Sequence, residues 1–341
     1  MKVDLKNYFC DLPFTYTEIH KDRQTMCCPY WNDTNLKKSP DYLKNWFSTE
    51  AEEIRESMLD GTFKNCSSEF CPHLNVLVNK GEATGPIRPI KEFNPNNYNK
   101  PKRIKICIDQ SCNLRCPTCR DNIIPNTDLN TALTLNQLRK VEEGFSDELE
   151  EFFTSGTGDP LYSKPMREYL INFPVEKYPK LDRIILHTNG ILLTTKLWDK
   201  LKNVRKFIKQ VEISIDAATK DTYENKTRLG GKWDVLIENL KFINKIETID
   251  KITTSFVTQQ ANYKEIIPFV ELMNKIFYKH RDHKNIFYRV ANWGTFSEEE
   301  YKKVNVLDNT HPEHYEFVNE VRKLNRYRNV ISNLELEAEL L

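Results

Sequence analysis

The chain has 341 residues, enough for one large domain with a smaller one, or for two domains. Its 50 lysines and arginines balance 49 aspartates and glutamates, so the net charge of +1 argues against a nucleic-acid or anionic-membrane binder. The charged N-terminus lacks the apolar run of a signal peptide, and no stretch approaches the roughly 20 apolar residues of a membrane span. We therefore expect a cytoplasmic protein without nucleic-acid or membrane partners.

All nine cysteines lie in the first 119 residues of the sequence. An odd number of cysteines in a chain without a secretion signal argues against a disulfide framework. Their short spacings predict metal binding instead. The cysteines stand at positions 10, 27, 28, 66, 71, 107, 112, 116 and 119.

The segment 81–102 is predicted to be a linker, because it contains two glycines, four prolines and four asparagines. It separates a cysteine-rich unit, residues 1–80, from a region at 103–295 in which strands and helices alternate. A charged helical extension, 296–341, follows, with spaced leucines that either cap the preceding region or contact a partner. These boundaries predict a small N-terminal domain, a linker, a large α/β domain and a C-terminal extension.

The α/β region has six predicted strands with helical patterns between them, the clearest of which runs from Trp233 to Ile243. Repeated strand–helix units imply parallel strands covered by helices. Six units are too few for a closed eight-stranded barrel, so we predict a partial (β/α)6 barrel of the TIM type. The predicted strands are 103–110, one ending at 152–154, 183–188, 211–216, 252–258 and 286–291.

Cys112, Cys116 and Cys119 form a Cys-x3-Cys-x2-Cys motif directly after the first of these strands. In a parallel α/β barrel, the loop after a strand lies at the catalytic face. A structural zinc site normally has four closed ligands, whereas three thiolates leave one position open for chemistry. The spacing alone also allows a zinc site completed by Cys107, so both alternatives stay open at this point.

The motif, read as CNLRCPTC after a first strand, resembles the radical SAM superfamily, close to its SPASM/twitch branch. Four later segments match the order of motifs in that family: 155–161, 188–190, 211–216 and 221–231. The resemblance implies that the three cysteines hold a [4Fe–4S] cluster. It also implies that S-adenosylmethionine (SAM) binds the open iron and is cleaved reductively.

The resemblance further assigns a set of SAM contacts along these segments. Asp159 replaces a glutamate of the family's Gly-Gly-Glu motif, which receives the methionine amino group, so its reach is one methylene shorter. Ser214 and Asp216 match the fourth-strand segment that contacts the ribose and carboxylate of SAM, and Arg228 matches an arginine that pairs with that carboxylate. The implied contacts are Thr157, Gly158, Asp159, Ser214, Asp216 and Arg228.

The N-terminal cysteines resemble the twitch module, which carries one auxiliary [4Fe–4S] cluster in the family. In most relatives this module follows the barrel, whereas here it precedes it. Cys28 is preferred over Cys27 because it lies five residues after Arg23, where relatives keep a glycine. A zinc-binding ribbon is the alternative for this unit. The implied ligands of the auxiliary cluster are Cys10, Cys28, Cys66 and Cys71.

The resemblance as a whole implies a radical SAM enzyme that removes a hydrogen from a substrate carbon, with oxidation or rearrangement of the substrate. A reductant such as flavodoxin or ferredoxin would supply the electron. Residues 1–80 leave no room for a separate leader-binding domain, which favours a carbohydrate or other small metabolite as substrate. A peptide-modifying enzyme of the maturase or epimerase type is the alternative. The rival from another class is a non-catalytic zinc protein that binds a partner.

Overall fold

The computed structural model describes residues 3–29, 31–32, 36, 41–95, 98–154, 157–292 and 294–334. The chain folds into two compact units, each built from several segments. Unit 1 comprises Met1–Asp109, Asp128–Thr157 and Pro174–Ile184, and unit 2 comprises Gln110–Thr127, Gly158–Phe173 and Ile185–Leu341.

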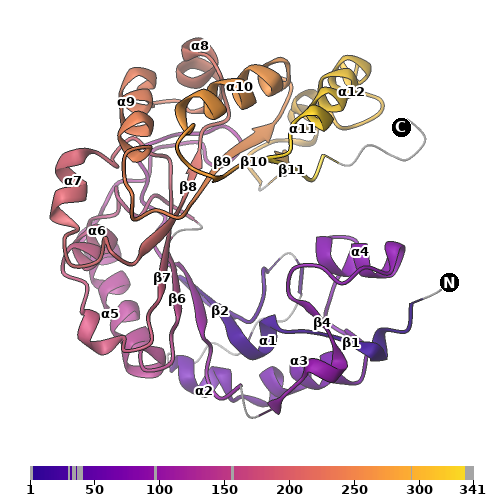
Figure 1. The fold of residues 1–341 in the computed structure, drawn as a ribbon, viewed down its shortest axis with the longest axis vertical. Coiled ribbons are helices and arrows are strands. Elements are labelled where there is room, and N and C mark those ends of the chain that lie inside the picture. Colours follow the sequence, from indigo (N-terminus) through magenta and orange to yellow (C-terminus); the bar gives the residue numbers. More distant parts are fainter. Residues whose placement is uncertain are drawn as a thin grey trace. The chain divides into compact units, whose positions relative to one another are not determined.

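Unit 1 combines the N-terminal segment with the first two strands of the predicted barrel (Figure 1). Its strands are β1 (Tyr8–Cys10), β2 (Tyr16–His20), β3 (Gln24–Thr25), β4 (Ile87–Pro89), β5 (Arg103–Cys107) and β6 (Glu151–Thr154). Its helices are α1 (Leu12–Thr15), α2 (Tyr42–Trp46), α3 (Thr49–Leu59), α4 (Pro72–Lys80) and α5 (Asp128–Phe145).

The main sheet of unit 1 has the strand order β6-β5-β2-β3. Strand β2 runs parallel to β5, and their register places Tyr16 beside Arg103 and His20 beside Cys107. Strand β6 is parallel to β5 on its other side, and β3 pairs antiparallel with β2. The N-terminal segment therefore supplies a parallel strand next to β5, which the sequence did not predict.

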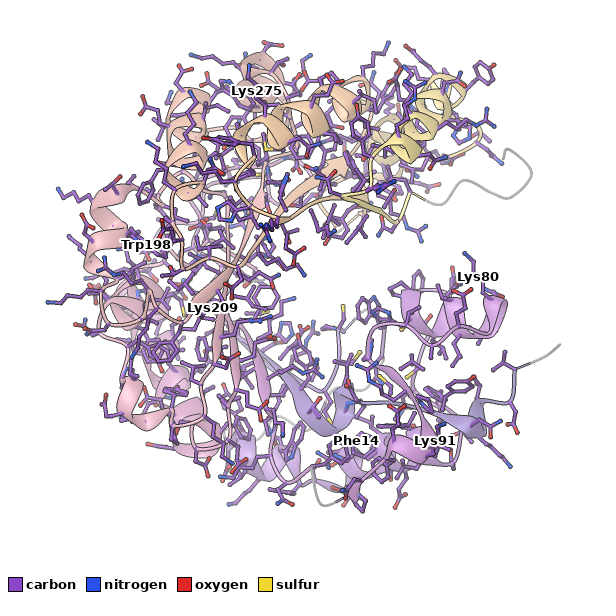
Figure 2. All side chains as sticks on the ribbon, in the orientation of Figure 1. Phe14, Lys80, Lys91, Trp198, Lys209 and Lys275 are labelled. Atoms are coloured by element: carbon purple, nitrogen blue, oxygen red, sulfur yellow. The ribbon has the colours of Figure 1, made fainter. Side chains whose placement is uncertain are left out.

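The segment predicted to be a linker contains β4, which pairs antiparallel with β1. Pro89 ends this strand, in keeping with the confinement of proline to edge strands. Phe93 and Tyr98 of the same segment pack against Phe9 and Phe14, with ring centroids 5.1 to 5.3 Å apart (Phe14 is labelled in Figure 2). The linker segment is thus folded against the N-terminal one.

Helix α3 begins at Thr49, because the side chain of the preceding Ser48 accepts a hydrogen bond from the Ala51 N–H. The Arg55 guanidinium of this helix stacks over the fully buried ring of Trp46 at 4.5 Å from its centroid. Arg55 also donates to the backbone oxygens of Trp46 and Pro13, at 2.9 and 3.0 Å. This buried arginine ties α1, α2 and α3 together.

Unit 2 carries the remaining elements, and β7 begins with two residues that belong to unit 1. Its strands are β7 (Arg183–Thr188), β8 (Ile208–Ser214), β9 (Lys251–Thr258), β10 (Asp282–Arg289) and β11 (Val330–Ser332). Its helices are α6 (Lys164–Ile171), α7 (Thr195–Lys200), α8 (Lys220–Thr222), α9 (Trp233–Ile243), α10 (Ile266–Ile276), α11 (Glu298–Val304) and α12 (His314–Arg322).

The strands of unit 2 lie in the order β7-β8-β9-β10-β11, and the β8–β9, β9–β10 and β10–β11 pairs are parallel. Helices α8, α9 and α10 gather along one side of these strands (Figure 1). Phe256, Phe269 and Phe287, from β9, α10 and β10, join them with ring centroids 4.9 to 5.8 Å apart. All six predicted strands are present as β5 to β10, so the predicted α/β class with parallel strands and covering helices is confirmed.

The C-terminal extension is helical as predicted over α11 and α12, but it also contains β11, which the sequence did not predict. Leu334 is buried, whereas Leu336, Leu340 and Leu341 lie outside the described residues. Within the described part of the chain, every helix is too short or too polar to cross a membrane.

Candidate functional site

The three-cysteine loop of unit 2 is pinned by backbone hydrogen bonds on both sides. The Cys112 N–H donates to the Ile124 oxygen at 3.0 Å, and the Arg115 N–H donates to the Leu229 oxygen at 2.9 Å. Cys112 and Cys116 are buried, while Cys119 is exposed. The loop therefore holds the thiols of Cys112 and Cys116 inside the protein and leaves that of Cys119 exposed to solvent.

Each of the three sulfur atoms accepts a hydrogen bond from a different side chain. The donors are Asn189 to Cys112 (3.9 Å), Arg228 to Cys116 (3.4 Å) and Arg120 to Cys119 (3.3 Å). Burial raises the pKa of the Cys112 thiol to about 11, and burial also raises that of Cys116 although the Arg228 charge opposes the rise. The positive charge of Arg228 beside the buried Cys116 thiol favours the thiolate form that binds metal.

Arg228 directly follows a π-helical turn, Tyr223–Thr227, a form that is frequent at functional sites. Its guanidinium lies 2.7 Å from the Asp216 carboxylate, and the two side chains are 12% and 2% exposed. Although burial opposes the charge, Asp216 raises the pKa of this guanidinium above its usual range. The buried Nε of Arg228 has no partner among the described residues. That donor, next to the Cys116 sulfur, suits an anionic group of a ligand.

Asp216 lies two residues after the end of β8 and adopts the left-handed region, with φ of 59°, which aspartate adopts more readily than most residues. One carboxylate oxygen accepts from the Val257 N–H at 2.7 Å, while the other pairs with Arg228. Asn262 donates to the Asp216 backbone oxygen at 2.9 Å. Asp216 is therefore held by its neighbours and in turn fixes Arg228.

Asp159 is buried and its carboxylate accepts four hydrogen bonds from within unit 2. One oxygen accepts from the N–H groups of Leu161 and Tyr162, at 2.9 and 3.1 Å. The other accepts from the Thr188 hydroxyl and the Asn189 N–H, both at 2.8 Å. Burial raises the pKa of this carboxyl, and the hydrogen bonds oppose that rise. Because a carboxylate has about four acceptor positions, Asp159 has none to spare for a methionine amino group.

Ser214 belongs to a chain of half-buried polar side chains on β7, β8 and β9. Its hydroxyl lies 2.9 Å from His187 Nε2 and accepts from the Ser255 hydroxyl at 3.3 Å. His187 Nδ1 lies 3.8 Å from the Glu212 carboxylate. The sequence reasoning missed His187 and the sulfur-facing amide of Asn189, although both stand at the end of a strand that it had predicted.

The remaining implied SAM contacts, Thr157 and Gly158, lie on the loop after β6. The Thr157 hydroxyl is 3.1 Å from the Cys107 oxygen and 3.3 Å from the Asp109 oxygen, so it holds the chain that leaves β5. Ser155 and Gly156 of the same motif lie outside the described residues. In the structure the Thr157 hydroxyl contacts the backbone oxygens of Cys107 and Asp109, and its predicted contact with SAM stays a prediction.

The N-terminal cysteines influence one another within unit 1. Burial raises the pKa of Cys10, and negative charge on Cys66 and Cys71 raises it further. Burial also raises the pKa of Cys27, and charges on Cys10, Cys66, Cys28 and Cys71 add to the rise. Cys28 acts on a different neighbour as well, because its charge contributes to the raised pKa of Cys107. Cys27 is thus electrostatically coupled to Cys10, Cys66 and Cys71, and the identity of the fourth ligand stays a prediction.

The sequence of the chain is similar to a known protein family and to several characterised proteins. Residues 107–273 match the model of the radical SAM superfamily. GTP 3',8-cyclase of Clostridium perfringens is 30% identical over 177 residues, 50% of this chain and 51% of that protein. AdoMet-dependent heme synthase of Methanosarcina barkeri is 24% identical over 180 residues, 52% of this chain and 48% of that protein. The chain therefore spans about half the length of these relatives.

Among solved structures, Streptococcus suis SuiB bound to precursor peptide SuiA is similar with a TM-score of 0.43 and 13% identity. That similarity covers 98% of this chain and 73% of SuiB. TYW1 with a lysine-pyruvate adduct bound is similar with a TM-score of 0.39 and 16% identity, over 66% of this chain and 73% of that one.

Proposed function

We propose, from the premise that this chain belongs to the radical SAM superfamily, that its three-cysteine loop holds a [4Fe–4S] cluster for reductive cleavage of SAM. When bound, such a cluster supplies an electron to SAM, and the radical that results removes a hydrogen from a substrate carbon. Arg228 is the observation that carries this proposal. Its guanidinium reaches the Cys116 sulfur while its buried Nε stays free for a ligand carboxylate.

Of the other residues around the loop, some would contact SAM directly and others position neighbouring side chains. Asp216 and Asp159 position their neighbours, because their carboxylates are engaged within the protein. Ser214 and the backbone of Gly158 remain our candidates for direct contact with SAM. Asn189 donates to the Cys112 sulfur and would help to set the electron density on this ligand of the cluster.

For the N-terminal cysteines we propose an auxiliary [4Fe–4S] cluster held by Cys10, Cys27, Cys66 and Cys71. Their mutual electrostatic influence supports this set, which exchanges Cys28 of the sequence-based prediction for Cys27. Two cubane clusters predict about eight irons per chain. Cys27→Ser should lower this content by about four, while Cys28→Ser should leave it unchanged. The opposite pattern would return Cys28 to the cluster.

We propose a carbohydrate or other small polar metabolite as the substrate, with a flavodoxin- or ferredoxin-type reductant. The half-buried chain of His187, Ser214, Glu212 and Ser255 supports this, since it offers alternating donors and acceptors to a hydroxyl-rich ligand. GTP, which one relative's name specifies, is not carried over, because the match covers about half of each chain. A peptide substrate is the alternative outcome of the experiment below.

The test begins with anaerobically reconstituted protein, SAM and dithionite, and with 5'-deoxyadenosine measured by chromatography. The wild type should release it, and Cys116→Ala should abolish release. Lys226→Ala, a change at an exposed side chain near Arg228, should leave release intact. Equal release from Cys116→Ala would refute the site. Deuterated candidate sugars and peptides then identify the substrate by transfer of deuterium into 5'-deoxyadenosine.

A further inference from the structure

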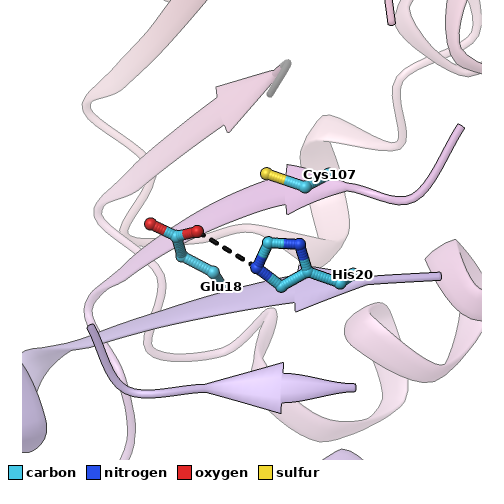
Figure 3. Close-up of side chains that lie close together, drawn as sticks. All are labelled: Glu18, His20 and Cys107. Carbon is cyan, nitrogen blue, oxygen red and sulfur yellow. Dashed lines mark hydrogen bonds and ion pairs between the residues drawn. The ribbon is translucent and has the colours of Figure 1, made fainter. Parts of the chain in front are cut away.

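A carboxylate, an imidazole and a thiol lie close together on the sheet of unit 1. None of the three belongs to either proposed cluster. Glu18 and His20 come from β2, and Cys107 comes from the neighbouring strand β5 (Figure 3). The register pairs His20 with Cys107, so the two side chains are direct cross-strand neighbours. One ligand atom from each residue lies within 4.8 Å of the other two.

We propose that Glu18, His20 and Cys107 bind one Zn²⁺ ion. Thiolate, imidazole and carboxylate are the three ligand types that zinc accepts, and a tetrahedral zinc places its ligand atoms about 3.3 to 3.8 Å apart. The three atoms need only small side-chain movements to reach that spacing. The two negative ligands also balance the charge of the ion, which matters because Glu18 and Cys107 are buried.

The surroundings orient the carboxylate as a zinc ligand requires. The Tyr16 hydroxyl donates to Glu18 Oε1 at 2.7 Å, and the Lys105 ammonium lies 3.8 Å from the same oxygen. Glu18 Oε2 is left on the side of His20, whose Nε2 is 3.1 Å away. One oxygen is therefore held by supporting groups, while the other faces the imidazole, an arrangement typical of metal-binding carboxylates.

The cysteine inventory is consistent with a third centre. The two proposed clusters use three and four of the nine cysteines, which leaves Cys28 and Cys107.

The alternative is a hydrogen-bonded polar cluster without metal, in which Glu18 and His20 share a proton. Metal analysis of the full-length protein, purified anaerobically with its clusters and dialysed against a chelator, separates the two. Wild type should retain about one zinc per chain. Cys107→Ala and the isosteric Glu18→Gln should each lose at least tenfold of it while keeping their iron and their circular dichroism spectrum. His311→Ala, a matched histidine control outside the three ligands, should keep the zinc.

X-ray absorption at the zinc edge gives the second readout. Sulfur at about 2.3 Å together with nitrogen or oxygen at about 2.0 Å would support the mixed site. An all-sulfur shell would place zinc in a cysteine cluster and overturn the proposal. Wild type with less than a tenth of an equivalent of zinc, or Cys107→Ala and Glu18→Gln with undiminished zinc, would overturn it too. Because the zinc readout does not use SAM cleavage, its failure is distinct from a failure of the proposed enzymatic activity.

Discussion

Replacing Arg228 tests the core of the proposed SAM site. Arg228→Leu leaves the Asp216 carboxylate, which is 1% exposed, with the Val257 N–H but without its cation at 2.7 Å. Breaking a buried ion pair in this way costs about 3–5 kcal/mol of folding free energy. Loss of the Nε donor would remove one charge-assisted hydrogen bond to the SAM carboxylate, about 1.5–3 kcal/mol, which weakens SAM binding about 10- to 150-fold.

Arg228→Lys separates these two effects. Its ammonium keeps a positive charge for Asp216, so we expect a loss of stability of only about 1–2 kcal/mol, but it has no donor in the place of Nε. SAM affinity should therefore fall nearly as far as in Arg228→Leu. Lys226→Ala is the matched control, because its ion pair with Asp221 at 3.5 Å is exposed and contributes less than about 1 kcal/mol.

Urea unfolding gives the stabilities, and equilibrium dialysis of SAM under anaerobic conditions gives the affinities. If Arg228→Lys binds SAM as tightly as wild type, the free Nε is not the ligand donor. If Arg228→Leu unfolds at the same urea concentration as Lys226→Ala, the pair with Asp216 does not contribute as the structure indicates.

Three further predictions concern single residues. Asn189→Ala removes the donor to the Cys112 sulfur and should lower SAM cleavage about 10- to 100-fold; activity within twofold of wild type would contradict this. Gly190→Ala should lower the unfolding free energy by about 1–3 kcal/mol in urea, because φ is +81° and the new Cβ would lie 2.9 Å from Leu236; an unchanged midpoint would count against it. Burial lowers the pKa of His283 to about 4, so its neutral form stabilises the fold above pH 6.5 and that stability is lost as pH falls toward 4. From pH 7 to 5, wild type should lose about 2 kcal/mol more than His283→Gln; equal losses would argue that His283 is not buried in its neutral form.

The strands that the sequence predicted share a strong local signal. Strands β5 and β8 alternate isoleucine or valine with polar residues, and burial of the apolar set explains why both were found. Strand β2, with the sequence YTEIH, is short and mostly polar, and it pairs with a strand more than 80 residues later in the chain. Such a pairing depends on distant residues, so no local pattern could predict it.

Some features of the candidate site could likewise be predicted from local sequence, while others depend on contacts between distant residues. The spacing of Cys112, Cys116 and Cys119 predicts a metal loop, because it depends only on neighbours in sequence. The commitment of Asp159 to Thr188 and Asn189 depends on two strands meeting, which spacing cannot show. Cys27 and Cys28 are adjacent in the chain, so their spacing cannot show which of them faces Cys10, Cys66 and Cys71.

The pairing of β2 with β5 bears on how this protein can be cut for laboratory use. A fragment that starts at residue 103 would retain the cysteine loop but would uncover one edge of β5 along its length. Uncovered edges of this kind recruit strands from other molecules, so such a fragment should precipitate or form mixed oligomers. Co-expression of residues 1–102 as a separate polypeptide should restore its solubility, and a useful truncation therefore keeps the N-terminal segment.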